Sequence, residues 1–131
     1  MNININDEIR SAKIYTMTSS GPKSDDIKNI LSNKNILLVG VPGAFTPTCN
    51  DDHLPGFIEN YKEFKEKGID EIIFISVNDP FVVSKWKEYN KADNIIFLSD
   101  ADSEFANMLN LKIDLSVIGL GFRLSRFALI I

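Results

Sequence analysis

Three short, mostly apolar runs limit what this chain can fold into more than any other feature of its sequence. They are residues 36–41 (ILLVGV), 71–77 (EIIFISV) and 95–98 (IIFL). Apolar character without alternation is typical of strands that are buried on both faces of a parallel sheet. We therefore expect three such strands at the centre of the fold.

Helical patterns lie between and after these runs. The clearest helix, over 80–89, has Asp79 as its N-cap and Pro80 as its first residue, and both residue types are favoured there. A second pattern ends at Gly68, and a third covers residues 102–109. These two helices are expected over 56–68 and 102–109. The residues expected to face the core on the three helices are Phe57, Tyr61, Phe64, Val82, Trp86, Tyr89, Phe105, Met108 and Leu109. The order of strands and helices predicts an α/β domain with a mostly parallel sheet flanked by helices.

The remaining segments are less regular. We expect residues 17–35 to form a polar connection with a short helical piece near 25–31, and residues 122–131 (FRLSRFALII) to form the last strand. The apolar end of that strand predicts cover on both faces. A natural domain rarely stops on such a segment, because termini usually lie at the surface. We therefore expect residues 1–131 to be a single domain that is truncated at its C-terminus.

The composition argues against several classes of function. The 131 residues carry a net charge of −4 and no run of basic residues, which argues against a nucleic-acid partner. No apolar stretch approaches the ~20 residues that cross a bilayer, and the N-terminus lacks the features of a secretory signal, so no membrane partner is expected. The single cysteine excludes an intrachain disulfide and a CxxC metal site, and we expect no metal or cofactor. The expected location is cytoplasmic, or organellar after loss of a presequence.

The single cysteine, Cys49, lies where a buried strand gives way to a helix, in the segment VPGAFTPTCN. Thr46 suits the N-cap and Pro47 the first helical position, which puts Cys49 in the first turn. Unpaired backbone N–H groups and the helix dipole stabilise an anion there, so the pKa of this thiol is expected below its usual ~8.5. Asp51 and Asp52 oppose ionisation, so a cation from elsewhere is required. The alternative is that Cys49 is a small buried apolar residue, the commonest fate of a free cysteine.

Two arginines close to each other in sequence are candidates for this cation. Of the 14 basic residues only three are arginine, and Arg123 and Arg126 fall within four residues on the last predicted strand. Alternation along a strand places them on opposite faces. Arg126 shares its face with apolar residues, so we expect it to be deeply placed and to face the thiolate, whereas Arg123 lies nearer the GLG turn and can reach water. The alternative for each is a surface arginine in a salt bridge.

His53 follows Cys49 by four residues and so belongs on the same helix face. A Cys–His pair is typical of thiol hydrolases, but such pairs normally come from different elements and a third group orients the imidazole. We favour a partly exposed helix histidine. Pro55 then removes a backbone donor and is expected to kink or restart the helix.

The segment VPGAFTPTCNDDHLPGF resembles the active-site segment of peroxiredoxins, whose motif PxxxTxxC is matched by Pro42, Thr46 and Cys49. The flanking HLPGF, SVNDPFVVSKW and RLSRFALI are similar to the type-5 subfamily, also called atypical two-cysteine or glutaredoxin-dependent. The likeness runs from about residue 36 to the end of the sequence, and residues 1–35 match loosely.

This resemblance implies a thioredoxin fold and a thiol peroxidase, in which the cysteine attacks the peroxide O–O bond and becomes a sulfenic acid. The implied catalytic residues are Cys49, Thr46, Arg126 and Pro42. The threonine hydroxyl and the arginine hold the peroxide oxygens, and the proline shields the pocket. Gly43 and the Cys49 backbone contribute N–H groups to substrate binding. Arg126 carries the arginine of the family's RF motif, in agreement with the argument from strand faces.

The resemblance also implies partners. They are a peroxide substrate, a homodimer partner for which Phe81 is a candidate apolar contact, and glutathione, glutaredoxin or thioredoxin as reductant. The family's resolving cysteine, where present, lies in a C-terminal segment that this sequence lacks, together with the last strand and helix. We therefore expect a one-cysteine cycle with an external thiol.

Two other thiol functions compete with this interpretation. A thioredoxin-type disulfide oxidoreductase needs CxxC, and Thr46 stands where the second sulfur belongs, so exchange within the motif is excluded. A peroxide-responsive sensor or binding module could use the same thiol without efficient turnover.

Overall fold

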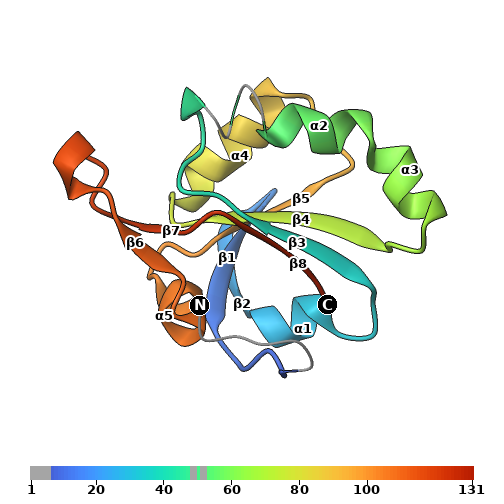
Figure 1. Ribbon diagram of the computed structural model, residues 1–131, viewed down its shortest axis with the longest axis horizontal. Coiled ribbons are helices and arrows are strands. Elements are labelled where there is room, and N and C mark those ends of the chain that lie inside the picture. Colours follow the sequence, from blue (N-terminus) through green and yellow to red (C-terminus); the bar gives the residue numbers. More distant parts are fainter. Residues whose placement is uncertain (1–6, 48–49, 51–52) are drawn as a thin grey trace.

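A six-stranded sheet forms the centre of the computed structural model, which describes residues 7–47, 50 and 53–131 (Figure 1). Its strands are β1 (Lys13–Thr18), β2 (Gly21–Asp26), β3 (Ile36–Gly40), β4 (Glu71–Ser76), β5 (Ile96–Ser99) and β8 (Phe127–Ile130). They lie in the spatial order β2-β1-β5-β4-β3-β8. A separate two-stranded ribbon contains β6 (Lys112–Asp114) and β7 (Phe122–Leu124), joined through the short 3-10 helix η2 (Ser116–Ile118).

The three predicted central strands are confirmed, and they are the parallel part of the sheet. β3 pairs with β4 in register from Ile36↔Glu71 onward, and β4 pairs with β5 from Ile73↔Ile96. The outer strands are antiparallel: β8 runs against β3, and β1 contacts β5 at Tyr15↔Ser99. The carboxyl ends of β3, β4 and β5 therefore meet at one edge, where ligand sites of open α/β sheets form.

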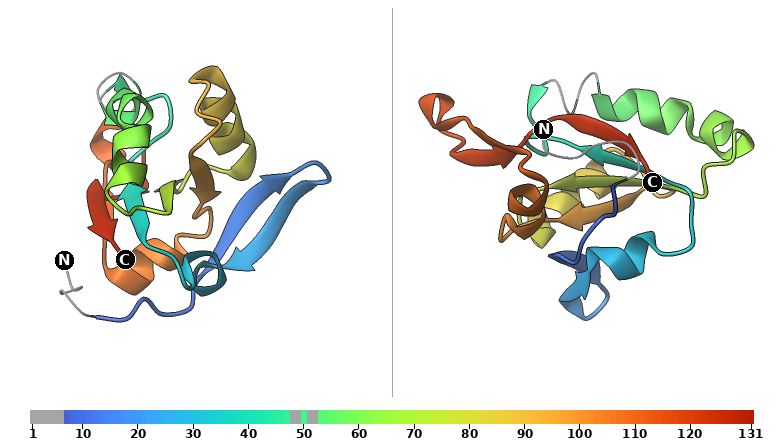
Figure 2. Two further views of the ribbon diagram at one scale, coloured as in Figure 1. Left: turned by 90° about the vertical axis from the view of Figure 1, so that its right-hand side faces the viewer. Right: turned by 60° about the horizontal axis from the view of Figure 1, so that its bottom comes forward.

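Helices cover both faces of this sheet (Figures 1 and 2). They are α1 (Ile27–Leu31), α2 (Leu54–Glu59), α3 (Tyr61–Glu66), α4 (Pro80–Tyr89) and α5 (Glu104–Leu109). α1 and α5 pack on the face that carries Ile36, Leu38 and Ile73, and α2 and α4 pack on the face that carries Phe74. Alternate residues of β3 and β4 thus enter two separate cores, which explains why their sequences are apolar throughout.

The start of α4 agrees with the sequence, and its inward face agrees in part. The Asp79 side chain accepts a hydrogen bond from the Val82 N–H at 2.9 Å, and Pro80 occupies the first turn, as predicted. Val83 and Trp86 are the buried residues of the helix, whereas Tyr89 is largely exposed. The predicted stripe is confirmed at Trp86, and Val82 packs partly buried against the core, but it is wrong at Tyr89 because the inward face is turned toward Val83.

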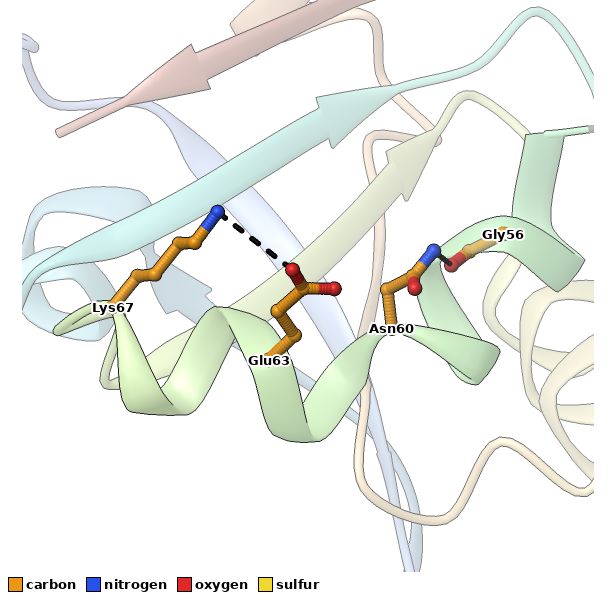
Figure 3. Close-up of polar contacts among 4 residues, drawn as sticks. All are labelled: Gly56, Asn60, Glu63 and Lys67. Atoms are coloured by element: carbon orange, nitrogen blue, oxygen red, sulfur yellow. Dashed lines mark hydrogen bonds and ion pairs between the residues drawn. The ribbon is translucent and has the colours of Figure 1, made fainter.

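The helix predicted over 56–68 is two helices, α2 and α3, that meet at Asn60. The Asn60 backbone N–H and side-chain Nδ2 both donate to the Gly56 carbonyl, at 3.1 and 2.8 Å (Figure 3). This local side-chain bond competes with regular helix continuation. α3 carries a surface ion pair between Lys67 and Glu63 at 3.8 Å, which the same view shows. Pro55 lies in the first turn of α2, consistent with the predicted restart.

Two predictions for the sheet edges are wrong. Residues 13–26 form the hairpin of β1 and β2, whose outer strand is mostly polar and exposed, so the first part of the connection predicted over 17–35 is wrong. The short helical piece expected near 25–31 is confirmed as α1. The strand predicted over 122–131 is divided into β7 and β8, which pair in different sheets. As an edge strand, β8 leaves Ile130 77% exposed, so its two faces are not both covered. Among the described residues, no helix is long and apolar enough to span a membrane.

Asp100 is a fully buried carboxylate at the carboxyl end of β5. Its two oxygens each accept a backbone N–H of α5, from Phe105 and Ala106, both at 2.9 Å. Burial raises the pKa of Asp100 to about 6, against the lowering effect of these two hydrogen bonds. The folded protein therefore binds this proton more tightly than the unfolded chain does.

We expect the free energy of unfolding to fall as pH rises from about 4 to about 6, since the native state holds more protons than the unfolded state in that interval. The loss attributable to Asp100 is at most roughly 3 kcal/mol. Urea unfolding of the parent and of Asp100→Asn at about pH 4, the lower end of this interval, and at about pH 7, above it, measures this loss. The parent should lose stability relative to the variant at the higher pH. If the free energies of unfolding of the parent and Asp100→Asn differed equally at both pH values, the pH dependence would not come from Asp100. The same conclusion would follow if the exposed control Asp93→Asn changed the pH dependence in the same way.

Candidate functional site

The segment that follows β3 forms a tight turn over the carboxyl edge of the sheet. The Val41 N–H donates to the Ile75 carbonyl at 3.1 Å, which extends the β3–β4 pairing by one residue. The chain then turns, and the Thr46 hydroxyl donates to the Gly43 carbonyl at 2.7 Å. Phe45 has a positive φ of 64°, an uncommon conformation for a residue with a side chain. We call residues 42–47 the active-site loop.

Gly43 is buried at the point where this loop is most crowded. A Cβ atom on Gly43 would lie 2.8 Å from Thr46 Cγ2 and 2.9 Å from Arg123 Nη1. Both distances are shorter than a Cβ tolerates, so a larger residue here would displace the Thr46 methyl group or the Arg123 guanidinium.

Two side chains from other elements hold the loop. Asn78, which follows β4, accepts the Ala44 N–H with Oδ1 at 2.8 Å. Arg123, on β7, donates from Nη1 to the Pro42 carbonyl at 3.1 Å and from Nε to the Leu120 carbonyl at 2.8 Å. The sequence analysis missed Asn78. Its place directly after a buried parallel strand is the signal that could have identified it.

The chain that continues beyond the loop is tied to α4. The Asn50 N–H donates to the Thr46 carbonyl at 2.8 Å, an i→i−4 bond of the kind that an N-cap residue accepts. Asn50 Oδ1 accepts Trp86 Nε1–H at 2.9 Å and Asn90 Nδ2–H at 3.2 Å. Cys49 itself, with Thr48, Asp51 and Asp52, lies outside the described residues. Its predicted place in the first helical turn therefore stays a prediction.

Arg126 contacts the segment that follows the cysteine. Its Nη1 lies 2.6 Å from His53 Nδ1. Since a guanidinium only donates, Nδ1 is the acceptor and the imidazole proton is on Nε2. Burial, and then the positive charge of Arg126, lower the pKa of His53, so this histidine is neutral at pH 7.

The two arginines are buried in the opposite order to the prediction. Arg126 is exposed and Arg123 is half-buried, with its guanidinium against backbone carbonyls. The prediction assumed strict alternation along a single strand. The chain instead leaves β7 after Leu124 and enters β8 at Phe127, so Arg126 lies between the two strands.

The surroundings of His53 argue against a thiol hydrolase. Its ring packs against Phe57 and Phe74, with centroids 5.3 and 5.9 Å away. A general base must become an imidazolium, and apolar rings on one side with a guanidinium on the other disfavour that charge. In the described part of the chain, no cluster of three or more His, Cys, Asp or Glu residues could hold a metal ion.

Two curated plant proteins are similar to most of this chain. Peroxiredoxin-2B of Arabidopsis thaliana is 42% identical over 127 residues, which cover 96% of this chain and 70% of that protein. Peroxiredoxin-2D of the same plant is 49% identical over 106 residues, which cover 80% of this chain and 65% of that protein. The chain thus spans about two thirds of the length of these relatives.

Solved structures share the fold. Reduced Prx3 of Vibrio vulnificus in complex with H2O2 has a TM-score of 0.94 and 37% identity, over 98% of this chain and 81% of that one. The antioxidant protein of Plasmodium falciparum, a 1-Cys peroxiredoxin, has a TM-score of 0.93 and 35% identity, over 98% of this chain and 78% of that one. The Redoxin family model matches residues 5–131. With its thioredoxin fold, this chain belongs to the peroxiredoxins, the thiol-dependent peroxidases of the Redoxin family.

Proposed function

We propose that this chain reduces hydrogen peroxide or organic hydroperoxides, with Cys49 as the nucleophile. The contact between Arg126 and His53 is the observation that most supports this, because it brings a permanent cation to the segment that follows the cysteine. A cation near the thiol favours the thiolate, which is the reactive form. The V. vulnificus structure, which contains H2O2, supports a peroxide as the substrate class.

The proposed cycle has two stages. The Cys49 thiolate attacks one peroxide oxygen, the O–O bond breaks, and an S–O bond forms. The other oxygen takes up a proton and leaves as water or an alcohol, so the sulfur is oxidised to a sulfenic acid and the peroxide is reduced. An external thiolate then displaces the sulfenic oxygen as water and forms a mixed disulfide, and a second thiol releases Cys49.

The loop residues have complementary roles in this proposal. The Thr46 hydroxyl and the Arg126 guanidinium hold the peroxide oxygens, and N–H groups of Gly43 and Cys49 assist them. Pro42 shields the reacting atoms from water. Stabilising the charge that develops on the leaving oxygen is the type of contribution that oxyanion donors make.

The reductant is proposed to be glutathione, glutaredoxin or thioredoxin, since the sequence contains no second cysteine. The 1-Cys peroxiredoxin of P. falciparum provides a one-cysteine precedent among the similar structures. A reducing compartment such as the cytoplasm suits this cycle, because low-molecular-weight thiols are abundant there.

Mass spectrometry with and without glutathione tests the proposed function. One equivalent of peroxide followed by glutathione should give a mixed-disulfide adduct on Cys49, and glutathione with glutaredoxin should sustain peroxide consumption. Without any thiol, excess peroxide should drive Cys49 to the sulfinic acid and abolish activity. Cys49→Ser should fold normally and consume no peroxide.

Two outcomes would contradict this proposal. Peroxide consumption by Cys49→Ser at the parent rate would remove Cys49 from the reaction. A parent protein that is oxidised once but does not cycle with excess reductant would instead be a sensor.

Arg126→Lys and Arg123→Lys should differ in their effects. Replacing Arg126 should cost about 2–4 kcal/mol of transition-state stabilisation, roughly a 30- to 1,000-fold loss of kcat/KM, because lysine keeps the charge but lacks the planar, forked donors. Replacing Arg123 should mainly lower stability by about 1–2 kcal/mol, because lysine offers one nitrogen where Arg123 uses Nε and Nη1 for the two backbone carbonyls.

Thiolate absorbance against pH, peroxide kinetics and urea unfolding of both variants separate these effects. A larger loss of kcat/KM in Arg123→Lys than in Arg126→Lys would reverse the proposed roles.

We also propose a homodimer that uses the ribbon of β6, η2 and β7. The ribbon projects from the end of the sheet that carries the active-site loop (Figure 2), and Arg123 ties the two together. Val117 is 94% exposed, and Ile118 and Phe122 are also exposed. Apolar side chains gathered on one projecting element are typical of an interaction surface. Phe81, at the start of α4, is another exposed apolar candidate.

Val117→Asp should shift the protein toward monomer, since a charge would be buried in the apolar interface. Sedimentation at micromolar concentration checks this. Ile130→Asp is the matched control, because Ile130 is 77% exposed on β8 and lies outside the ribbon. A monomeric parent, or an equal shift in both variants, would count against this interface.

A further inference from the structure

A polar cluster of Ser76, Asn78 and Ser99 lies at the carboxyl ends of β4 and β5, next to the active-site loop. Ser76 and Ser99 are almost completely buried. The Ser99 hydroxyl donates to the Asn78 carbonyl at 2.6 Å, and the Asn78 N–H donates to Ser76 Oγ at 3.3 Å. The main chain of Asn78 is therefore held by hydroxyl groups from two strands.

The Asn78 side chain connects this cluster to the loop. Its Oδ1 accepts the Ser76 hydroxyl at 3.0 Å and the Ala44 N–H at 2.8 Å. Ser76 supports the amide oxygen from the sheet, and the Ala44 N–H approaches it from the loop. Because Ala44 is itself buried, losing this acceptor would leave its N–H without a partner at a large cost.

The hydrogen bond between Ala44 and Asn78 affects the position of Thr46 through a short stretch of strained backbone. Phe45, between them, has φ +64°, a conformation that persists only where its surroundings enforce it. Thr46 N–H and its hydroxyl both donate to the Gly43 carbonyl, at 3.4 and 2.7 Å. A fixed Ala44 amide therefore fixes the turn that directs the Thr46 side chain.

From these contacts we infer that Asn78 is a positioning residue for the peroxidase reaction. It holds the active-site loop from the sheet side and so sets the direction of the Thr46 hydroxyl. This inference rests on the proposed function, because the reaction at Cys49 is what the loop serves. Among the described residues, the hydrogen bonds of Asn78 go to Ala44, Ser76 and Ser99, so it acts on the reaction through the loop.

Two replacements of Asn78 separate a positioning role from a general loss of folding. Asn78→Leu has a similar size and no acceptor, so it should free the Ala44 N–H. Asn78→Asp keeps an oxygen that can accept both hydrogen bonds but adds a negative charge beside the active-site loop. Such a charge raises the pKa of a thiol without moving the loop.

Rapid-mixing kinetics of Cys49 oxidation by hydrogen peroxide, measured across pH, form the first test. Asn78→Leu should be slower by roughly 10- to 100-fold at every pH, as expected for a displaced positioning group. Asn78→Asp should be slow at low pH and should return to within about threefold of the parent once its thiol is fully ionised. Asn60→Leu, which removes another asparagine–backbone bond of 2.8 Å far from the loop, is the matched control and should react like the parent.

Hydrogen exchange of the Ala44 amide is the second test and does not depend on activity. This amide should be protected in the parent and in Asn78→Asp and should exchange faster in Asn78→Leu. If Asn78→Leu does not fold, Asn78→Ala removes the same acceptor with less steric demand.

The outcomes are distinguishable. A parent whose Cys49 does not react with peroxide would refute the proposed function. The exchange test would still show whether Asn78 protects the Ala44 amide. Parent-like kinetics or unchanged Ala44 exchange in Asn78→Leu would overturn the role of Asn78. An equal loss of rate in the Leu and Asp variants at all pH values would also overturn it.

Discussion

Burial of both faces of β3 and β4 is the constraint on which the rest of this structure depends. Leu38 and Ile73 enter the core beneath α1 and α5, while Val39 and Phe74 enter the core beneath α2 and α4. Helices must then cover both faces, and because helical connections join β3, β4 and β5, these strands run parallel and their carboxyl ends meet at one edge. The active-site loop lies at this edge because it directly continues β3. Its anchor, Asn78, lies there because it closely follows β4.

The parts of the fold that sequence predicts well are those fixed by local chemistry or by continuous apolar burial. The three central strands and the Asp79 cap of α4 are of this kind. The β1–β2 hairpin was missed because the sequence of β2, GPKSDD, has no apolar side to indicate a strand. It is held instead by pairing with β1, a contact that only the tertiary structure reveals.

The candidate site, like the fold, has parts that the sequence could predict and parts that it could not. The turn at Gly43 and the hydroxyl of Thr46 belong to a contiguous motif, and the sequence singled out both residues. The burial of the two arginines depends on where one strand ends and the next begins, and strict alternation could not show the break between Leu124 and Phe127. Arg123 was expected to reach water, yet it donates to the Pro42 carbonyl across 81 residues of sequence. Such long-range bonds leave no periodic signal.

The partner of Arg126 matters for the electrostatics of the site. A carboxylate at the position of His53 would hold the guanidinium equally well, but it would cancel the positive charge that a thiolate requires. A neutral imidazole accepts one N–H through Nδ1 and adds no negative charge of its own. Burial and the arginine itself keep that imidazole neutral by lowering its pKa. The histidine therefore holds the guanidinium without placing a negative charge beside it, which suits the role toward an anion that we propose for Arg126.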